Sequence, residues 1–158
     1  MTNLAYDVVR ALSGYTVSTA ESCTGGMIGS ALTAIPGSSS VYKGGVVSYT
    51  NEVKQKLLGV ESNILEKYGA VSSQVATAMA VGVRNSLNTD VAIAVTGLAG
   101  PGGDDFGNPI GTVYIGYADA NKSFSVECNF KGDREAVRLQ SVRAALQLLR
   151  DMSEKLDN

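Results

Sequence analysis

The residues best suited to chemistry stand together at positions 19–26, which read Thr-Ala-Glu-Ser-Cys-Thr-Gly-Gly. They lie between a short β-branched run and an apolar helical pattern, so the sequence predicts a strand-to-helix turn. Free backbone N–H groups and the helix dipole favour anions at such a turn. Ser22 is the candidate nucleophile for acyl transfer. Cys23 is its rival, because a helix N-terminus lowers the pKa of a thiol.

The neighbours of Ser22 can support a reaction at its hydroxyl. An acyl-transfer nucleophile needs N–H donors for the oxyanion, and the backbone of residues 24–26 can supply them. The Glu21 carboxylate can orient an ammonium or a substrate group. Each feature also has a structural interpretation. The Ser22 hydroxyl can cap the helix, Cys23 can fill buried space, and Glu21 can be a favourable charge near the dipole.

The chain contains no histidine, so neither a Ser-His-Asp nor a Cys-His arrangement can form. Lys54 is the best candidate base, because it lies where the next predicted strand turns into a helix. Its amine must lose a proton near neutral pH, which requires burial or a neighbouring cation to lower its pKa from about 10.4. Lys43 and Lys56 are interpreted as solvated surface charges. Tyr49 can pass a proton or donate a hydrogen bond, or it can pack at the sheet edge.

Length and composition predict a single domain, residues 1–158, in the cytoplasm. The 158 residues are 44% hydrophobic, which suffices for one core but not for two ordinary domains. A formal charge of -2 gives no general attraction to nucleic acid or membranes, and no apolar run approaches the ~20 residues that span a bilayer. The two cysteines form no disulfide framework, and the N-terminus lacks a secretory pattern. The usual zinc ligand sets are unavailable, whereas a carboxylate-bound magnesium is left open.

Helical and strand patterns alternate along the chain. The predicted helices are a first one ending near Gly14, then residues 25–34, 51–58, 62–68, 72–87 and 133–155. The predicted strands are residues 15–20, 42–49, 90–95, 112–118 and 123–130. The expected N-caps include Asn51, Ser62 or Asn63, and Asp133. The alternation predicts an α/β fold, a three-layer α/β/α sandwich with a mixed, mostly parallel sheet.

Two loops are expected to share one rim of this sheet. In open α/β folds, ligands bind at the carboxyl ends of the strands. The turn at residues 21–26 and the glycine-rich loop at residues 96–103 both leave such an end. Their exposed N–H groups can hold a phosphorylated ligand, or the glycines can serve only for tight turns. The spacing matches neither the Walker A pattern nor GxGxxG.

Six blocks of the sequence, in this order and over nearly the whole chain, resemble the CinA C-terminal domain family. The blocks are residues 19–26, 37–39, 45–54, 69–72, 96–101 and 132–134. The family includes stand-alone nicotinamide-nucleotide amidases, which convert nicotinamide mononucleotide and water to nicotinate mononucleotide and ammonia. The resemblance implies a Ser-Lys amidohydrolase, with Ser22 as nucleophile, Lys54 as base and Tyr49 as the assisting hydroxyl.

The implied reaction starts with attack of Ser22 on the carboxamide carbon and requires neither a metal nor an organic cofactor. Arg134 and Arg138 lie one helical turn apart, so they can meet a phosphate or a ring substituent, or form ion pairs on a solvated helix. The opposite lip of the pocket is assigned to three residues of the 96–103 loop. The candidate substrate-binding residues are Glu21, Cys23, Thr24, Gly25, Gly26, Thr96, Gly97, Ala99, Arg134 and Arg138.

The expected partner is a small molecule, nicotinamide mononucleotide, and the resemblance also points to a homodimer or a larger homo-oligomer. No nucleic acid or membrane partner is expected. A non-catalytic nucleotide-binding module is the alternative, since some family members are fused to another domain with its own activity. The filled nucleophile, base and hydroxyl positions favour the enzyme. Thiol chemistry at Cys23 is a third and less favoured interpretation.

Overall fold

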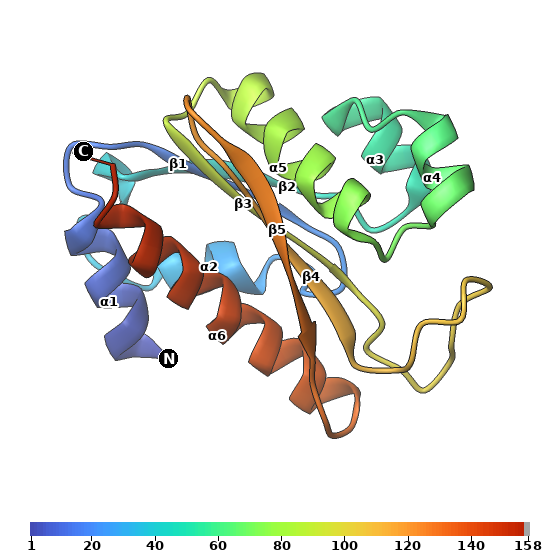
Figure 1. Cartoon of the computed structure of the whole chain (residues 1–158). Coiled ribbons are helices and arrows are strands. Elements are labelled where there is room, and N and C mark those ends of the chain that lie inside the picture. The colour runs from blue at the N-terminus through green and yellow to red at the C-terminus, as the bar shows by residue number, and fades with distance from the viewer. Residues whose placement is uncertain (157–158) are drawn as a thin grey trace.

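The structure, a computed structural model, describes residues 1–156 and arranges them around a five-stranded sheet (Figure 1). The strands are β1 (Val17–Glu21), β2 (Tyr42–Val47), β3 (Val91–Gly97), β4 (Thr112–Ala118) and β5 (Ser123–Asn129). The helices are α1 (Thr2–Ala11), α2 (Met27–Thr33), α3 (Asn51–Leu58), α4 (Ser62–Tyr68), α5 (Ser73–Leu87) and α6 (Arg134–Ser153), with a short 3-10 helix η1 (Ser38–Ser40).

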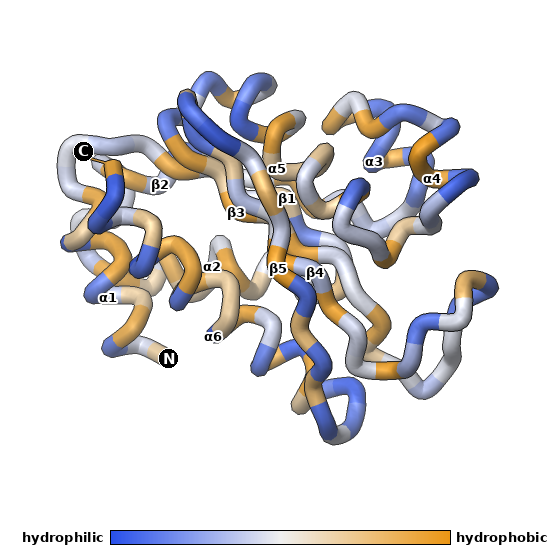
Figure 2. Tube along the Cα trace, in the orientation of Figure 1, coloured by the Kyte–Doolittle hydropathy of each residue, from blue (hydrophilic) through white to orange (hydrophobic). Residues whose placement is uncertain are grey.

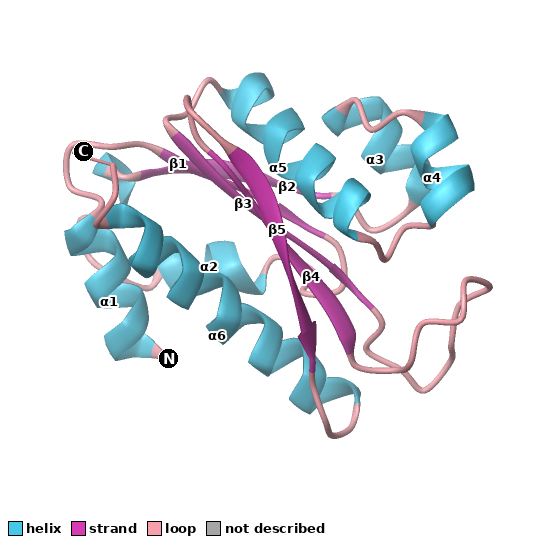
Figure 3. Ribbon diagram, in the orientation of Figure 1, coloured by secondary structure: helices cyan, strands magenta, loops and turns pink. Residues whose placement is uncertain are grey.

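The strand order across the sheet is β2-β1-β3-β4-β5. β1 pairs in parallel with both β2 and β3, whereas β3–β4 and β4–β5 are antiparallel, so four of the five strands run in the same direction. Helices α1, α2 and α6 cover one face, and α3, α4 and α5 lie on the other (Figure 3). The predicted α/β/α sandwich with a mixed sheet is confirmed. The central strands β1 and β3 are buried on both faces, as a doubly covered sheet requires. β3 is largely apolar, whereas β1 also buries the polar residues Ser18, Thr19 and Glu21.

The sheet separates two apolar cores, seen as orange segments that turn toward the sheet from both helix layers (Figure 2). One core joins α1, α2 and α6 to the sheet through residues such as Leu12, Ile28 and Leu146. The other joins α3, α4 and α5 to the opposite face through residues such as Leu58 and Met79. Both cores are needed to position the site, because α3 is attached through one and α6 through the other.

Several predicted boundaries shift where local hydrogen bonds decide them. The helix predicted from residue 25 begins at Met27, because Gly25 and Gly26 have φ of 59° and 106° and therefore form a turn. The strand predicted to residue 49 ends at Val47. The N-cap of α3 is Thr50 rather than Asn51, and its hydroxyl accepts from the Val53 N–H. At α4 the N-cap position is Glu61, not the predicted Ser62 or Asn63.

Other predicted elements agree with the structure to within a few residues. Asp133 caps α6 through the Ala136 N–H, as predicted, although this helix ends at Ser153 instead of residue 155. The hairpin strands β4 and β5 match their predicted ranges to within one residue. Among the helices of the described part, none combines the length and the apolar character that crossing a membrane would need. The three parallel strands end at one edge of the sheet, where the loops after them meet.

Candidate active site

The turn after β1 carries Ser22 and is fixed by its backbone. The Ser22 N–H donates to the Val95 carbonyl oxygen of β3 at 3.0 Å, and the Gly25 N–H donates to the Ser22 carbonyl oxygen at 3.1 Å. A second turn follows, in which the Met27 N–H donates to the Thr24 carbonyl oxygen at 3.0 Å. Its two central residues, Gly25 and Gly26, both have positive φ, which explains the glycine pair. Ser22 is thereby held at the end of the sheet.

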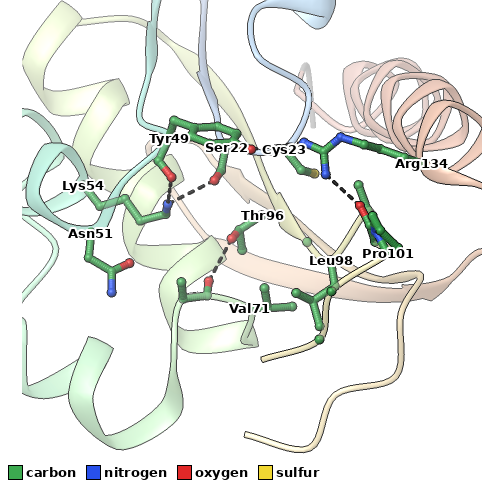
Figure 4. A pocket seen from close by; sticks show the side chains of 16 residues that line it. Ser22, Cys23, Tyr49, Asn51, Lys54, Val71, Thr96, Leu98, Pro101 and Arg134 are labelled. Carbon is green, nitrogen blue, oxygen red and sulfur yellow. Dashed lines mark hydrogen bonds between the residues drawn. The ribbon is translucent and has the colours of Figure 1, made fainter. Parts of the chain in front are cut away.

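Lys54 reaches Ser22 from α3. Its Nζ lies 3.0 Å from Ser22 Oγ and 3.4 Å from the Tyr49 carbonyl oxygen (Figure 4). It also lies 2.8 Å from the Ser48 carbonyl oxygen. The two carbonyls belong to the residues that follow β2, so the early end of this strand frees them to face the amine. The side chain is only 1% exposed. The structure therefore brings together the two residues that the sequence suggested as nucleophile and base.

Burial disfavours the charged form of the Lys54 amine and lowers its pKa to about 8. About one tenth of such amines are neutral at pH 7. A neutral amine has two N–H groups and one lone pair. The two N–H groups match the Ser48 and Tyr49 carbonyls, which leaves the lone pair to accept the hydroxyl proton of Ser22. This is the arrangement that a serine nucleophile needs when no imidazole is present.

A cavity of about 440 Å³ opens over these two side chains. It lies between the nucleophile turn, the start of α3, the loop before α5, the glycine-rich loop after β3 and the start of α6. Its lining consists of Ser22, Cys23, Tyr49, Asn51, Lys54, Ala70, Val71, Thr96, Gly97, Leu98, Ala99, Gly100, Pro101, Gly102, Gly103 and Arg134. The two charged residues in this lining, Lys54 and Arg134, are both cations. The cavity therefore favours an anionic ligand.

Arg134 bridges two sides of the cavity. One guanidinium nitrogen donates to the Gly100 carbonyl oxygen at 2.8 Å, and another donates to the Tyr49 hydroxyl at 3.1 Å (Figure 4). The Tyr49 hydroxyl thus contacts Arg134 rather than Ser22, and this side chain is 58% exposed. Thr96 also joins two segments, since its hydroxyl donates to the Ala70 carbonyl oxygen at 2.8 Å.

Glu21, predicted to contact substrate, directs its carboxylate into α2 instead. The carboxylate accepts from the Thr24 hydroxyl at 2.7 Å, from the Ile28 N–H at 2.9 Å and from the Gly29 N–H at 3.1 Å. It is buried and does not belong to the cavity lining. Its position satisfies N–H groups at the start of α2 that would otherwise be unpaired.

The remaining predicted residues divide between the cavity and its surroundings. Thr96, Gly97 and Ala99 line the cavity, as does Cys23. Burial raises the pKa of the Cys23 thiol to about 11, so the thiolate that thiol chemistry requires is disfavoured. Outside the lining are Thr24, Gly25, Gly26 and Arg138. Arg138 contacts the nucleophile turn from behind, because its Nε donates to the Cys23 carbonyl oxygen at 2.9 Å.

Sequence reasoning missed several lining residues. They are Asn51, Ala70, Val71, Leu98, Gly100, Pro101, Gly102 and Gly103. Some signal was present, because most of them lie in or beside the glycine-rich loop and the blocks that carry the family resemblance. Their approach to Ser22 was not readable from spacing, since it depends on how separate loops meet at the sheet edge. In the described part of the chain, no group of three or more His, Cys, Asp or Glu side chains forms a metal site.

Known proteins resemble the chain over almost its whole length. The family model described as the CinA C-terminal domain matches residues 1–153. A CinA-like protein from Rippkaea orientalis is 52% identical over 140 residues, which are 87% of this chain and 34% of the relative. The chain spans about a third of the length of the curated relatives it matches.

Solved structures agree with the fold. A crystal structure of a competence-damaged protein (CinA) superfamily protein from Klebsiella pneumoniae matches with a TM-score of 0.94 and 36% identity, covering 98% of each chain. That of a competence/damage inducible protein from Agrobacterium tumefaciens matches with a TM-score of 0.92 and 41% identity, covering 96% of this chain and 94% of the other.

Proposed function

Because the chain belongs to the CinA C-terminal domain family, we propose that it is an amidohydrolase that converts nicotinamide mononucleotide and water to nicotinate mononucleotide and ammonia. The observation that carries the proposal is the 3.0 Å separation of Lys54 Nζ and Ser22 Oγ at the base of the cavity. A buried amine with a lowered pKa beside an alcohol is a recognised way to activate a serine.

In the first half of the proposed reaction, Ser22 Oγ forms a bond to the carboxamide carbon while its proton passes to Lys54. The carbonyl oxygen becomes an oxyanion, which N–H groups of the 23–26 turn stabilise. When the tetrahedral intermediate collapses, the C–N bond breaks and Lys54 returns the proton to the departing nitrogen, so ammonia leaves. The product of this half is an ester between Ser22 and the nicotinoyl group.

In the second half, water attacks the same carbon and Lys54 takes its proton. Collapse of the second intermediate breaks the bond to Ser22 Oγ, and the proton returns to the serine. The Ser48 and Tyr49 carbonyls hold the amine in both halves, because each can keep one N–H group of Lys54. No other general base is required from the side chains of the site.

Arg134 supports the choice of a phosphorylated substrate. It borders the cavity, and the lining contains no carboxylate that would repel a phosphate. Two of its five N–H donors already hold the Tyr49 hydroxyl and the Gly100 carbonyl, which fixes the guanidinium at the mouth. The remaining donors are available for a phosphate oxygen. We assign the phosphate to this end and the carboxamide to the Ser22 end.

The test is an ammonia assay with three amides: nicotinamide mononucleotide, its riboside and free nicotinamide. We expect the wild-type protein to favour the mononucleotide, and Ser22→Ala to lower its kcat by at least about 10⁴-fold, because the nucleophile is lost. Ser13→Ala, at an exposed serine that precedes β1 whereas Ser22 follows it, is the matched control and should retain full activity. Full activity of Ser22→Ala would rule out the assigned nucleophile.

A binding experiment separates the enzyme from a nucleotide-binding module. Calorimetric titration of Ser22→Ala with the mononucleotide should give binding with little turnover. If the wild-type protein also binds the mononucleotide but releases no ammonia, the chain is a binding module and the amidase proposal fails.

A further inference from the structure

The turn that holds Ser22 has two backbone N–H groups without an acceptor in another residue. Within residues 1–156, the N–H groups of Cys23 and Thr24 donate to no carbonyl or side chain of another residue. Cys23 borders the cavity, and Thr24 directly behind it is completely buried. The Cys23 N–H has only its own thiol sulfur, which is a weak acceptor, and the Thr24 N–H has none. Buried N–H groups that lack a good acceptor are rare in proteins, so this pair indicates a ligand oxygen at this position.

The geometry of the turn identifies the direction of these two groups. The bond from the Gly25 N–H to the Ser22 carbonyl oxygen defines a β-turn over residues 22–25. Asn88 is the only non-glycine residue with positive φ in the described part, so Cys23 and Thr24 both have negative φ. Only a type I turn combines these features, and its conformation resembles one helical turn. The Cys23 and Thr24 N–H groups therefore point to the same side, as at the start of a helix.

Arg138 holds the central peptide of this turn from the opposite side. In a trans peptide the C=O and the N–H point in opposite directions, so the Cys23 carbonyl and the Thr24 N–H are opposed. Arg138 Nε reaches from α6 and donates to that carbonyl at 2.9 Å. Because the donor is a guanidinium, the bond is stronger than one between neutral groups. Arg138 thus keeps the carbonyl away from the side on which the two N–H groups lie.

The central peptide is the part of the turn that can rotate. If the Cys23–Thr24 peptide rotated by about 180°, the type I turn would become a type II turn. The Cys23 carbonyl oxygen would then lie on the side of the N–H groups, where it would repel an oxyanion. The rotation would also require positive φ at Thr24, which is costly for a β-branched residue. The Thr24 hydroxyl is anchored to the Glu21 carboxylate at 2.7 Å, which holds this residue further. Arg138 and Glu21 therefore restrain the same peptide from two directions.

We propose that Arg138 is a positioning residue, which holds the Cys23–Thr24 peptide so that the N–H groups of Cys23 and Thr24 stabilise the oxyanion formed at Ser22. This inference rests on the proposed amidase function. It differs from the sequence prediction, which placed Arg138 against a phosphate or a ring substituent of the substrate or in an ion pair, because the structure places that side chain outside the cavity lining. Arg134 and Arg138 lie one helical turn apart but have different proposed roles. Arg134 binds the phosphate of the substrate, and Arg138 positions the peptide that stabilises the oxyanion.

The kinetic test compares Arg138→Ala, Arg138→Lys and the control Arg143→Ala, which removes an exposed arginine from the same helix. For Arg138→Ala we expect kcat to fall about 10- to 100-fold with KM changed by less than about two-fold, because an oxyanion donor acts in the transition state. The fold decrease in kcat should be the same with the mononucleotide and with its riboside as substrate. Arg138→Lys should recover part of the loss, since an ammonium can donate to the same carbonyl. Arg143→Ala should match the wild type.

A rise in KM for the mononucleotide alone would overturn the proposal, because it would show that Arg138 contacts the phosphate. Unchanged kinetics in Arg138→Ala would overturn it as well. A loss of kcat that follows only the fraction of unfolded protein, measured by thermal unfolding, would reduce Arg138 to a structural role. Each result differs from failure of the amidase proposal, which would appear as absence of ammonia with the wild-type protein.

A second measurement does not depend on the amide substrate. An alkyl fluorophosphonate reacts with an activated serine: a bond forms between Ser22 Oγ and phosphorus, fluoride leaves, and the serine proton passes to Lys54. Its phosphoryl oxygen occupies the oxyanion position, so Arg138→Ala should slow labelling by a factor similar to its loss of kcat. Mass spectrometry of the intact protein gives the rate. Equal labelling of wild type and variant, including no labelling of either, would overturn the proposal whether or not any amide is hydrolysed.

Discussion

Two regions that border the cavity differ in burial. At the base of the cavity, Lys54 is 1% exposed and its amine contacts three oxygen atoms. In the loop of residues 98–111, which we call the arm, Phe106 is 49% exposed and Ile110 is 46% exposed. The arm extends away from the sheet (Figure 1). Its bonds to other segments include those from Asn108 Nδ2 to the Val71 carbonyl, in the loop before α5, and from Arg134 of α6 to the Gly100 carbonyl. Both regions border the same cavity.

The difference follows from what each region has to do. A general base works only at a fixed distance from the nucleophile, so the Lys54 region is built from buried groups with fixed partners. The arm lines the cavity without carrying a group of the proposed reaction, and it contains glycines and exposed side chains that few contacts restrain. We therefore expect substitutions at the base to have large effects and comparable substitutions in the arm to have small ones.

The largest effect is expected from Lys54→Met, which keeps the shape of the side chain and removes the amine. Loss of the base should lower kcat by about 10³- to 10⁴-fold. In the wild type, kcat/KM should rise with pH through an apparent pKa near 8, because the neutral amine is the active form. The ammonia assay between pH 6 and 10 measures both. A flat profile over this range would exclude Lys54 as the base.

The same variant tests the cost of burying the amine. Since the pKa of Lys54 is about 8 when folded and near 10.5 when unfolded, only the unfolded chain holds this proton between those pH values. Stability therefore rises with pH through this window, by up to about 3 kcal/mol, and the burial cost is fully present below pH 8. The free energy of unfolding is measured in urea for the wild type and for Lys54→Met at each pH. The value for the wild type minus the value for the variant should show this rise. A difference that stays constant with pH would contradict it.

An intermediate effect is expected from Gly82→Ala, at the contact between α5 and α3. A Cβ at Gly82 would lie 1.9 Å from the Leu58 carbonyl oxygen, so α3 would have to move, and α3 carries Lys54. Overpacking of this kind costs about 1–3 kcal/mol or more. We expect a lower midpoint in urea unfolding together with a lower kcat. The control is Gly102→Ala in the arm, where a Cβ would meet nothing within 4 Å. If both variants unfold at the same midpoint, the proposed contrast between the two regions is wrong.

The smallest effect is expected from Phe106→Ala in the arm. The ring lies against Gly69, where an added Cβ would be 2.6 Å from it, but half of the side chain is exposed. Its removal should cost less than about 1 kcal/mol of global stability. Amide hydrogen exchange in residues 98–111 should become faster while exchange in β3 stays unchanged. A large drop in global stability would show that the arm belongs to the core.

Much of the fold followed from the sequence because hydrophobic periodicity and caps are local signals. The strands predicted at residues 90–95 and 112–118 from apolar and β-branched runs are observed at 91–97 and 112–118, and Asp133 correctly marked the start of α6. The predicted start of α2 at residue 25 was wrong because two glycines with positive φ form a turn there instead. The glycine turn directly follows the turn over residues 22–25, which carries Cys23 and Thr24.

The sequence by itself determined which groups are available: a chain without histidine, with a serine in a strand-to-helix turn and a lysine in the next such turn. Only the tertiary structure decided what they contact. Parallel pairing of β1 with β2 brings Lys54 within 3.0 Å of Ser22, and the same packing directs the carboxylate of Glu21 into α2 and Arg138 onto the Cys23 carbonyl. The physical reason is that residue types and caps act over a few positions, whereas distances between loops are set by how the strands align and how the helices pack on them.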